Sequence, residues 1–180
     1  MSRSGEAKNV SDIVYKSDMS IDERVMMAIV RVAERFKKTS SATFKKWGLT
    51  FSQYNLLRVL DSSKDGQNAM KDVNRIMLVS SANMTGIAKR LEKSGFIVRS
   101  SDPNDDRRKM LQITPEGMKV LKDIADHKER NLRRYLKKYS DEQKLALLET
   151  LREMLPQSKT GRQSVIVRDF QDVLGNNISH

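Results

Sequence analysis

No cysteine occurs in the 180 residues of this chain. Its absence excludes disulfide bonds, zinc sites built on thiolates and any switch that works through cysteine oxidation. The chain also has no run of eighteen consecutive apolar residues, and residues 1–20 contain no apolar core of signal-peptide length. We therefore expect no membrane-spanning segment and a cytoplasmic location.

Catalytic patterns are also missing. No arrangement of serine, histidine and aspartate suggests an activated nucleophile, and no glycine-rich loop suggests a phosphate cradle. Of the two histidines, His180 carries no signal, and His127 lies four residues after Asp123. That spacing could hold a metal ion, but an ion pair on a helix surface is the better interpretation. We expect no enzyme, no metal and no cofactor.

The charge balance is strongly positive, with a formal net charge of +11. Each Lys or Arg that neutralises a phosphate releases condensed counterions, so this excess favours a nucleic acid as partner. A basic protein without such a partner remains the alternative. The chain is 38% hydrophobic and 32% charged, which favours a thin helical protein whose core is completed by a partner chain.

Capping boxes predict where three helices start. In each, a hydroxyl and a side-chain carbonyl or carboxylate satisfy backbone N–H groups of the first turn, and the pairs are Ser20 with Glu23, Thr50 with Gln53, and Ser140 with Gln143. The first of these helices extends to about Lys46, and Gly48 ends it. Residues 1–19 form an N-terminal extension.

The middle of the chain alternates short helices with turn residues. Residues 62–68 have the composition of a turn, and the apolar spacing predicts helices over 70–77 and 81–93. Ser80 or Ser81 caps the second of these, and Gly95 ends it. Two short apolar runs, 96–98 and 110–113, then predict a β-hairpin whose turn is marked by Asp102-Pro103-Asn104-Asp105.

Thr114 and Pro115 open a long helix, because threonine is a good N-cap and proline fits the first helical position. The last helix stops before Pro156. The tail 156–180 contains an apolar cluster over 165–174, which could be a short docking helix or part of a disordered segment. The predicted fold is mainly α with a small β-hairpin, and the order of elements between about Met70 and Gly117 is that of a winged helix-turn-helix.

The helix 81–93 has two chemically different faces. Its apolar side chains share the face that must pack inward, and these are Met84, Ile87, Ala88 and Leu91. The candidate DNA-binding residues on or near the rest of the helix are Ser80, Ser81, Asn83, Thr85, Gly86, Lys89 and Arg90. Asn83 could pair with adenine and Lys89 or Arg90 with guanine, while the hydroxyls suit phosphates or bases. An ordinary solvated face is the alternative interpretation.

The tip of the predicted hairpin carries clustered charges, Arg107, Arg108 and Lys109 beside Asp102, Asp105 and Asp106. An arginine on a short, turn-braced hairpin can reach a DNA minor groove, where narrow A·T tracts concentrate negative potential. Asp105 could hold Arg107 through a charge-assisted bond and so fix its direction. The candidate wing contacts are Asp105, Arg107 and Arg108.

Residues 80–117 and 47–60 resemble the MarR family of bacterial winged helix-turn-helix regulators. The specific part is a D-x-R wing followed by L-x-I-T-P-x-G, and the resemblance extends over about Ile21 to Leu155. It implies a homodimer on double-stranded DNA, with the helix 81–93 in a major groove and the wing in the flanking minor groove. Asp105 and Arg107 occupy the positions of the family's wing aspartate and minor-groove arginine.

The resemblance also implies a division of the chain and an effector pocket. A first dimerisation helix (20–47) and C-terminal dimerisation helices (118–155) flank the DNA-binding region 48–117. The pocket would take a small aromatic or amphipathic molecule between the dimer helices and the DNA-binding region. Its candidate lining residues are Met26 or Met27, Trp47, Phe51 and Tyr54, although apolar residues at helix junctions are usually plain core.

Two positions depart from the family pattern. Asp106 stands where an arginine is usual, so Arg108 is either the second wing arginine or a strand-edge residue. Leu78 stands in the turn before the helix 81–93, where the family often has glycine.

The hypothesis that follows is a sequence-specific, ligand-responsive repressor that binds a palindromic operator. A non-specific architectural DNA-binding protein is the alternative, because the basic runs 35–46 and 130–138 lie outside the helix 81–93 and the wing, the predicted reading head for DNA. A protein-interaction adaptor built on a winged helix is a third.

Overall fold

The computed structural model describes residues 18–103 and 105–155. The chain divides into two compact units, Met1–Phe36 and Lys37–His180. All but the last two residues of the predicted N-terminal extension, and the whole tail 156–180 with its apolar cluster, lie outside the described residues.

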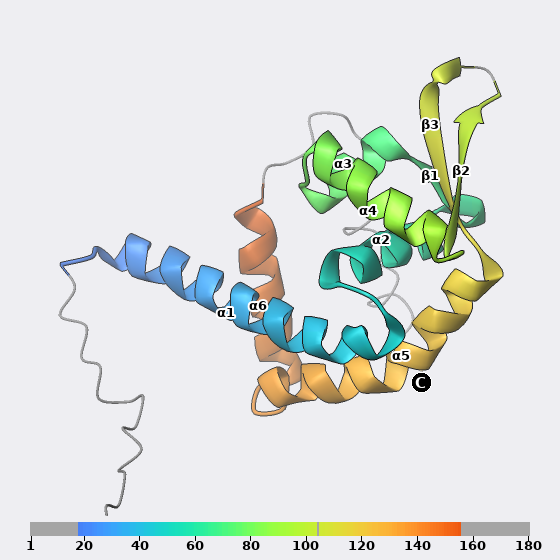
Figure 1. The fold of residues 1–180 in the computed structure, drawn as a ribbon. Helices are drawn as coiled ribbons and strands as arrows, with labels where there is room; N and C mark the ends of the chain where they lie inside the picture. Colours follow the sequence, from blue (N-terminus) through green and yellow to red (C-terminus); the bar gives the residue numbers. More distant parts are fainter. Residues whose placement is uncertain (1–17, 104, 156–180) are drawn as a thin grey trace, which may run out of the picture. The chain divides into compact units, whose positions relative to one another are not determined.

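The described residues are mainly helical, with one small antiparallel sheet, as predicted (Figure 1). The helices are α1 (Ile21–Phe44), α2 (Phe51–Asp61), α3 (Met70–Met77), α4 (Ser81–Lys93), α5 (Pro115–Leu136) and α6 (Asp141–Glu153), with 3-10 turns η2 (Lys45–Trp47) and η3 (Lys64–Gly66). The strands are β1 (Gln67–Ala69), β2 (Ile97–Asp102) and β3 (Asp105–Ile113). Within the described ranges, none of these helices is long and apolar enough to cross a membrane.

The predicted capping boxes are all formed. The Ser20 N–H donates to Glu23 Oε2 at 3.0 Å, and the Glu23 N–H donates to the Ser20 hydroxyl oxygen at 3.2 Å. The pairs Thr50–Gln53 and Ser140–Gln143 do the same. Each box satisfies two N–H groups that the first helical turn would otherwise leave without a partner. The start of α1 is therefore set locally, and its end differs from the prediction only in becoming a 3-10 turn after Phe44.

The sheet is larger than the predicted hairpin. Its order is β1-β3-β2, and β1 pairs with β3 from Gln67 opposite Gln112 to Ala69 opposite Met110. The prediction of a turn over all of residues 62–68 was therefore wrong for its last two residues. The strands β2 and β3 also extend well beyond the apolar runs 96–98 and 110–113. Near the tip both strand faces meet solvent, so no alternation of apolar and polar residues marks the pairing there.

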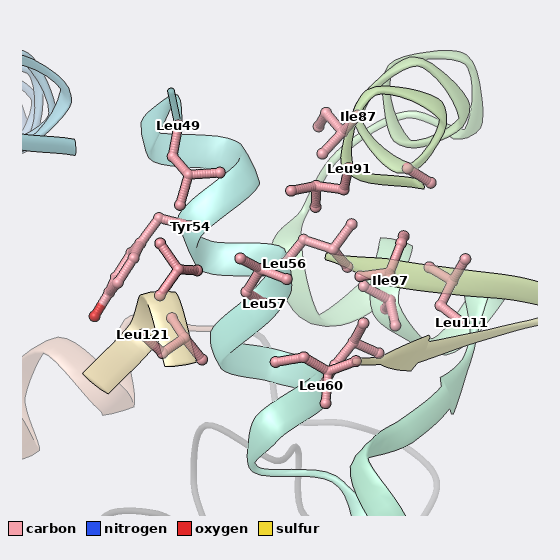
Figure 2. Close-up of a cluster of buried hydrophobic side chains, with 14 of the residues drawn as sticks. Leu49, Tyr54, Leu56, Leu57, Leu60, Ile87, Leu91, Ile97, Leu111 and Leu121 are labelled. Atoms are coloured by element: carbon pink, nitrogen blue, oxygen red, sulfur yellow. The ribbon is translucent and has the colours of Figure 1, made fainter. Parts of the chain in front are cut away.

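The core of the second unit is built around α2. Leu56, Leu57 and Leu60 are fully buried and point toward apolar side chains of α4, α5, β2 and β3. Figure 2 shows these leucines between Leu91 of α4 and Leu121 of α5, with Ile97 and Leu111 beside them. Burying apolar area of this kind is the main stabilising term in a small domain. The core thus joins the helices to the base of the hairpin.

The end of the hairpin is fastened to the end of α4. Thr114 donates its hydroxyl to the carbonyl of Gly95 at 2.7 Å, and its N–H bonds to the carbonyl of Phe96 at 3.0 Å. The same threonine caps α5 by accepting from the N–H of Gly117. A Cβ on Gly117 would collide with the Phe96 carbonyl oxygen and lie 2.7 Å from Ile113 Cγ1. The T-P-x-G motif is therefore explained by packing.

The turn between α3 and α4 contains a leucine in a left-handed conformation. Leu78 has φ 52° and ψ 41° and ends α3 as its C-cap. For a residue other than glycine, this left-handed conformation costs roughly 1–2 kcal/mol of conformational energy, because Cβ crowds the following carbonyl oxygen. The side chain is 77% exposed, so packing within the chain does not offset that cost.

We expect Gly117→Ala to lower the free energy of unfolding by about 1–3 kcal/mol, because the added methyl overpacks the junction. The matched control is Gly86→Ala in α4, where a Cβ would meet only Arg90 Nη2 at 3.7 Å. That change should leave stability unchanged or raise it by up to about 1 kcal/mol. Urea unfolding of the full chain at one protein concentration measures both. Equal stability of Gly117→Ala and wild type would contradict the junction model.

Candidate nucleic-acid interface

The inward face of α4 is the one predicted. Met84, Ala88 and Leu91 are fully buried and Ile87 nearly so. These positions recur every three or four residues, which places them on one stripe of the helix. Packing of that stripe against α2 and the hairpin base fixes the rotation of α4 about its axis. The opposite face is therefore held outward.

Polar bonds shape the start of α4. Ser80 is the N-cap, and its hydroxyl oxygen accepts from the N–H of Asn83 at 3.3 Å. Asn74 of α3 donates its side-chain amide to Ser81 Oγ at 3.1 Å. The hydroxyl of Thr85 donates to the Ser81 carbonyl at 2.9 Å, within the helix. The hydroxyls of Ser80, Ser81 and Thr85, which were predicted to contact DNA, therefore all make a hydrogen bond within the chain. Ser80 and Ser81 act there as acceptors, so each keeps an O–H to donate.

Three outward side chains of α4 are available for bonding to another molecule. Asn83, Lys89 and Arg90 are exposed. Within residues 18–103 and 105–155, none of the three makes a side-chain hydrogen bond or an ion pair. The helix therefore presents an amide and two cations, whose donors and acceptors are available to a ligand.

Gly86 lies among these side chains. Its backbone is helical, and a Cβ there would make only an ordinary contact. Nothing within the described chain therefore requires glycine, although glycine weakens a helix by about 1 kcal/mol relative to alanine. A close approach of another molecule to the α4 backbone would explain it.

Asp105 holds the wing through the backbone of Arg107. Its Oδ1 accepts the backbone N–H of Arg107 at 3.0 Å, and it does not bond the guanidinium. Aspartate commonly bonds a backbone N–H two residues ahead, and this local geometry wins over the longer side-chain pair. The predicted charge-assisted bond between Asp105 and Arg107 is therefore formed, but its donor is the backbone N–H of Arg107 and not the guanidinium. The Arg107 guanidinium is exposed and has no ion-pair partner among the residues the structure describes.

Arg108 is held inside the chain. Its Nη1 lies 3.3 Å from Asp102 Oδ2, and its Nη2 lies 3.9 Å from Asp72 Oδ2 on α3. The Asp102 side chain is only 16% exposed, so water screens this pair less than a fully exposed one. Asp72 also pairs with Arg75. Arg108 therefore connects the hairpin to α3, a contact that no spacing in the sequence indicates.

Two further contacts hold the hairpin in place. Arg99 of β2 bonds Glu92 of α4, with 2.7 Å between the guanidinium and Oε2. Lys109 donates to Ser101 Oγ at 2.8 Å and to the Asp106 carbonyl at 3.1 Å. The side chains of Arg99, Arg108 and Lys109 thus bond other residues of the chain, whereas the Arg107 guanidinium at the hairpin tip bonds none of the described residues. Neither Arg99 nor Glu92 was predicted as a functional residue.

The aromatic residues predicted to line an effector pocket lie mostly together. Tyr54 is buried and stacks on Phe44 at 4.1 Å between ring centroids, and Phe51 lies 6.3 Å from Phe44. Burial raises the pKa of the Tyr54 phenol above its ordinary value, so the group is neutral near pH 7. Trp47 packs partly buried beside this core. Met26 belongs to the first unit, Met1–Phe36.

His127 does not form the predicted surface ion pair with Asp123. Its ring meets Trp47 edge-on, with 5.1 Å between centroids, and its Nδ1 is buried without a hydrogen-bond partner in the described structure. His127 is half-buried against Trp47, a contact between distant segments that a spacing rule cannot detect. No cluster of three metal-ligating side chains occurs within the described ranges.

Comparison with known proteins identifies the relationship. A sequence model described as the MarR family matches residues 47–108. YfiV of Bacillus subtilis (strain 168), an HTH-type transcriptional regulator, is 32% identical over 140 residues, which is 77% of this chain and 86% of YfiV. This chain belongs to the MarR family. It is thus a DNA-binding transcriptional regulator, and it belongs with regulators and not with enzymes.

Two solved structures share the fold. Sco3205, a MarR family regulator from Streptomyces coelicolor solved in complex with DNA, superposes with a TM-score of 0.71 at 23% identity, covering 79% of this chain and 93% of Sco3205. BpsR of Bordetella bronchiseptica, whose DNA binding is regulated by 6-hydroxynicotinic acid, gives 0.65 at 22% identity, covering 73% and 98%. At these identities the likeness concerns the winged-helix fold alone.

We expect Arg108→Ala to loosen the hairpin without unfolding the protein. Backbone amides of β2 and β3 should exchange with deuterium faster, because the connection to α3 is lost, while stability falls by no more than about 1 kcal/mol for a half-exposed pair. Hydrogen–deuterium exchange followed by mass spectrometry measures this. Arg107→Ala is the matched control and should leave exchange unchanged. Identical hairpin exchange in the two variants would show that the Arg108 contact has no mechanical role.

Proposed function

We propose that this MarR-family protein is a sequence-specific repressor that acts on DNA in the cytoplasm, with α4 in a major groove and the β2–β3 wing in the flanking minor groove. One observation carries the proposal. On α4 and the wing, Asn83, Lys89, Arg90 and Arg107 are exposed and uncommitted, while Arg99, Arg108 and Lys109 beside them are paired within the chain. The paired side chains hold the wing in place, and the unpaired ones keep their donors and acceptors available to a partner.

Each open group on α4 has a matching feature in a major groove. The amide of Asn83 suits the N6 and N7 atoms of adenine, and Lys89 or Arg90 suits the O6 and N7 acceptors of guanine. Ser80, Ser81 and Thr85 lie at the helix N-terminus, where the dipole favours a phosphate. Gly86 permits the helix backbone to approach the groove floor.

The wing provides a second contact of a different kind. Arg107 enters the minor groove, whose negative potential is greatest where A·T pairs narrow it. Asp105 holds the backbone at Arg107 and so fixes where the arginine side chain starts. Arg108 positions the wing and does not contact the DNA.

The protein acts as a homodimer. Apolar side chains are exposed along α1, along α6 and just after α6, and these are Ile21, Val25, Met26, Met27, Val30, Val32, Leu145, Leu147, Met154 and Leu155. A partner chain that covers them would remove this area from water. The dimerisation segments are 20–47 and 118–155, flanking the DNA-binding region 48–117. A two-fold dimer reads an inverted repeat with half-sites one helical turn apart, and its occupancy blocks transcription.

A small aromatic or amphipathic effector tunes this binding. Trp47, Phe51 and Tyr54 supply aromatic side chains for such a molecule, and Met26 is a further candidate lining residue. The likeness to BpsR, whose DNA binding a hydroxylated aromatic acid regulates, supports an effector of this class.

Arg107→Ala and Lys89→Ala should each weaken binding to a duplex enriched from a random library by the wild-type protein. The expected loss is about 1–3 kcal/mol, or roughly 5- to 150-fold, with unchanged thermal stability because neither side chain is paired. Gel-shift titration at fixed salt measures it, and Lys122→Ala, which removes one charge from α5, is the control. Unchanged affinity in both variants would refute this reading head. A near-equal affinity of the wild type for random DNA would favour an architectural role instead.

Val30→Glu in α1 and Leu147→Glu in α6 should shift the protein from dimer to monomer, because each buries a charge in the proposed interface. Val98→Glu on β2 is the matched control, since the three side chains are 50%, 49% and 53% exposed. Sedimentation equilibrium across a concentration series gives the masses. A monomeric wild type, or dimers that both glutamates leave intact, would contradict the proposed interface.

A further inference from the structure

Leu78 is the residue that the fold explains least. It adopts φ 52° in the turn between α3 and α4, and its side chain is 77% exposed. Glycine adopts this backbone conformation without strain and would expose no apolar surface. The leucine side chain therefore contributes nothing to the described fold that offsets its strain, and strain of this kind is typical of a binding position.

The turn holds Leu78 in a defined place. The N–H groups of Leu78 and Val79 both bond to the carbonyl of Asn74, the second at 3.2 Å. The side chain of Asn74 bonds Ser81 at 3.1 Å and so connects α3 to the first turn of α4. Leu78 thus lies two residues before the N-cap of α4, at the end of the helix that carries Asn83.

Leu78 is also isolated among apolar residues. Its neighbours Met77 and Val79 are partly buried against the core, and Ser80 and Ser81 beyond them are polar and exposed. A protein partner would need a contiguous apolar patch, and one side chain does not provide it. A single small apolar group is a better match.

We propose that Leu78 contacts the 5-methyl group of a thymine at the edge of the major groove and adds a base preference to those of α4. In a helix-turn-helix the N-terminal residues of the second helix meet the bases, so the turn before it lies at the groove edge. The thymine methyl is the apolar group that the major groove presents there. This inference rests on the proposed function, because it needs α4 in the groove.

The test begins with two parallel selections from a random duplex library, one with the wild-type chain and one with Leu78→Gly. Both should enrich the same inverted repeat, but one thymine in each half-site should be enriched by the wild type alone. Replacing that thymine with deoxyuridine removes only the methyl group. The substitution should weaken wild-type binding about three- to fivefold, the ratio expected for one methyl-sized apolar contact, and leave Leu78→Gly unaffected.

Two variants separate the side chain from the backbone. Leu78→Met keeps an apolar side chain and should keep the thymine preference. Leu78→Asn tolerates the left-handed conformation but is polar, and it should behave like Leu78→Gly. Thermal unfolding should show that Leu78→Gly is at least as stable as wild type, so that lost binding is not lost folding.

The outcomes also separate this inference from the proposed function. If Lys89→Ala and Arg107→Ala weaken binding but wild type and Leu78→Gly select the same bases, the Leu78 inference is overturned and the reading head stands. Equal weakening of Leu78→Gly on every duplex, with no effect of deoxyuridine, would place the leucine on the sugar–phosphate backbone and also overturn it. If Lys89→Ala and Arg107→Ala have no effect, the proposed function itself fails.

Discussion

The hydroxyl of Thr114 bonds the carbonyl of Gly95, its N–H bonds the carbonyl of Phe96, and Gly117 packs directly against that second carbonyl. These contacts join the end of α4, the start of β2, the end of β3 and the start of α5 at one point. The angle between α4 and the wing is set here, and so is the direction in which α5 leaves this junction. The proposed contact with two grooves at once needs that angle to be rigid, because contact at one groove would otherwise cost ordering entropy at the other.

The charges of the wing and α4 divide into two groups. Arg99 bonds the hairpin to α4, Arg108 bonds it to α3, and Lys109 bonds one hairpin strand to the other. Arg107 and Lys89 are exposed and make no such bond within the described residues. The first group positions the second. The backbone carbonyl of Asp106 accepts from Lys109, a bond that does not depend on the side chain at this position. In the proposed complex, a wing that offers one arginine to the minor groove makes a contact that depends more on groove width than on total charge.

Local chemistry explains what could be predicted. The capping box at Thr50, the inward stripe of α4 and the helix start at Thr114 depend on residues within one or two turns of each other, and all were predicted correctly. Contacts between distant segments could not be predicted, because no local pattern indicates them. The pairing of β1 with β3, the bond from Arg108 to Asp72 and the contact of His127 with Trp47 are of this kind. The bond between Asp105 and Arg107 was predicted, but not that the backbone N–H of Arg107 is the donor instead of the guanidinium.

The most direct test of the two-groove account is methylation interference with dimethyl sulfate on the duplex that the wild-type protein enriches. The reagent methylates guanine N7 in the major groove and adenine N3 in the minor groove, so each groove gives its own signal. The account predicts N7 interference within each half-site and N3 interference in the flanking minor groove, in two copies related by a two-fold axis. Arg107→Ala should remove the N3 signals alone. Interference confined to one groove, or a single unrepeated footprint, would contradict it.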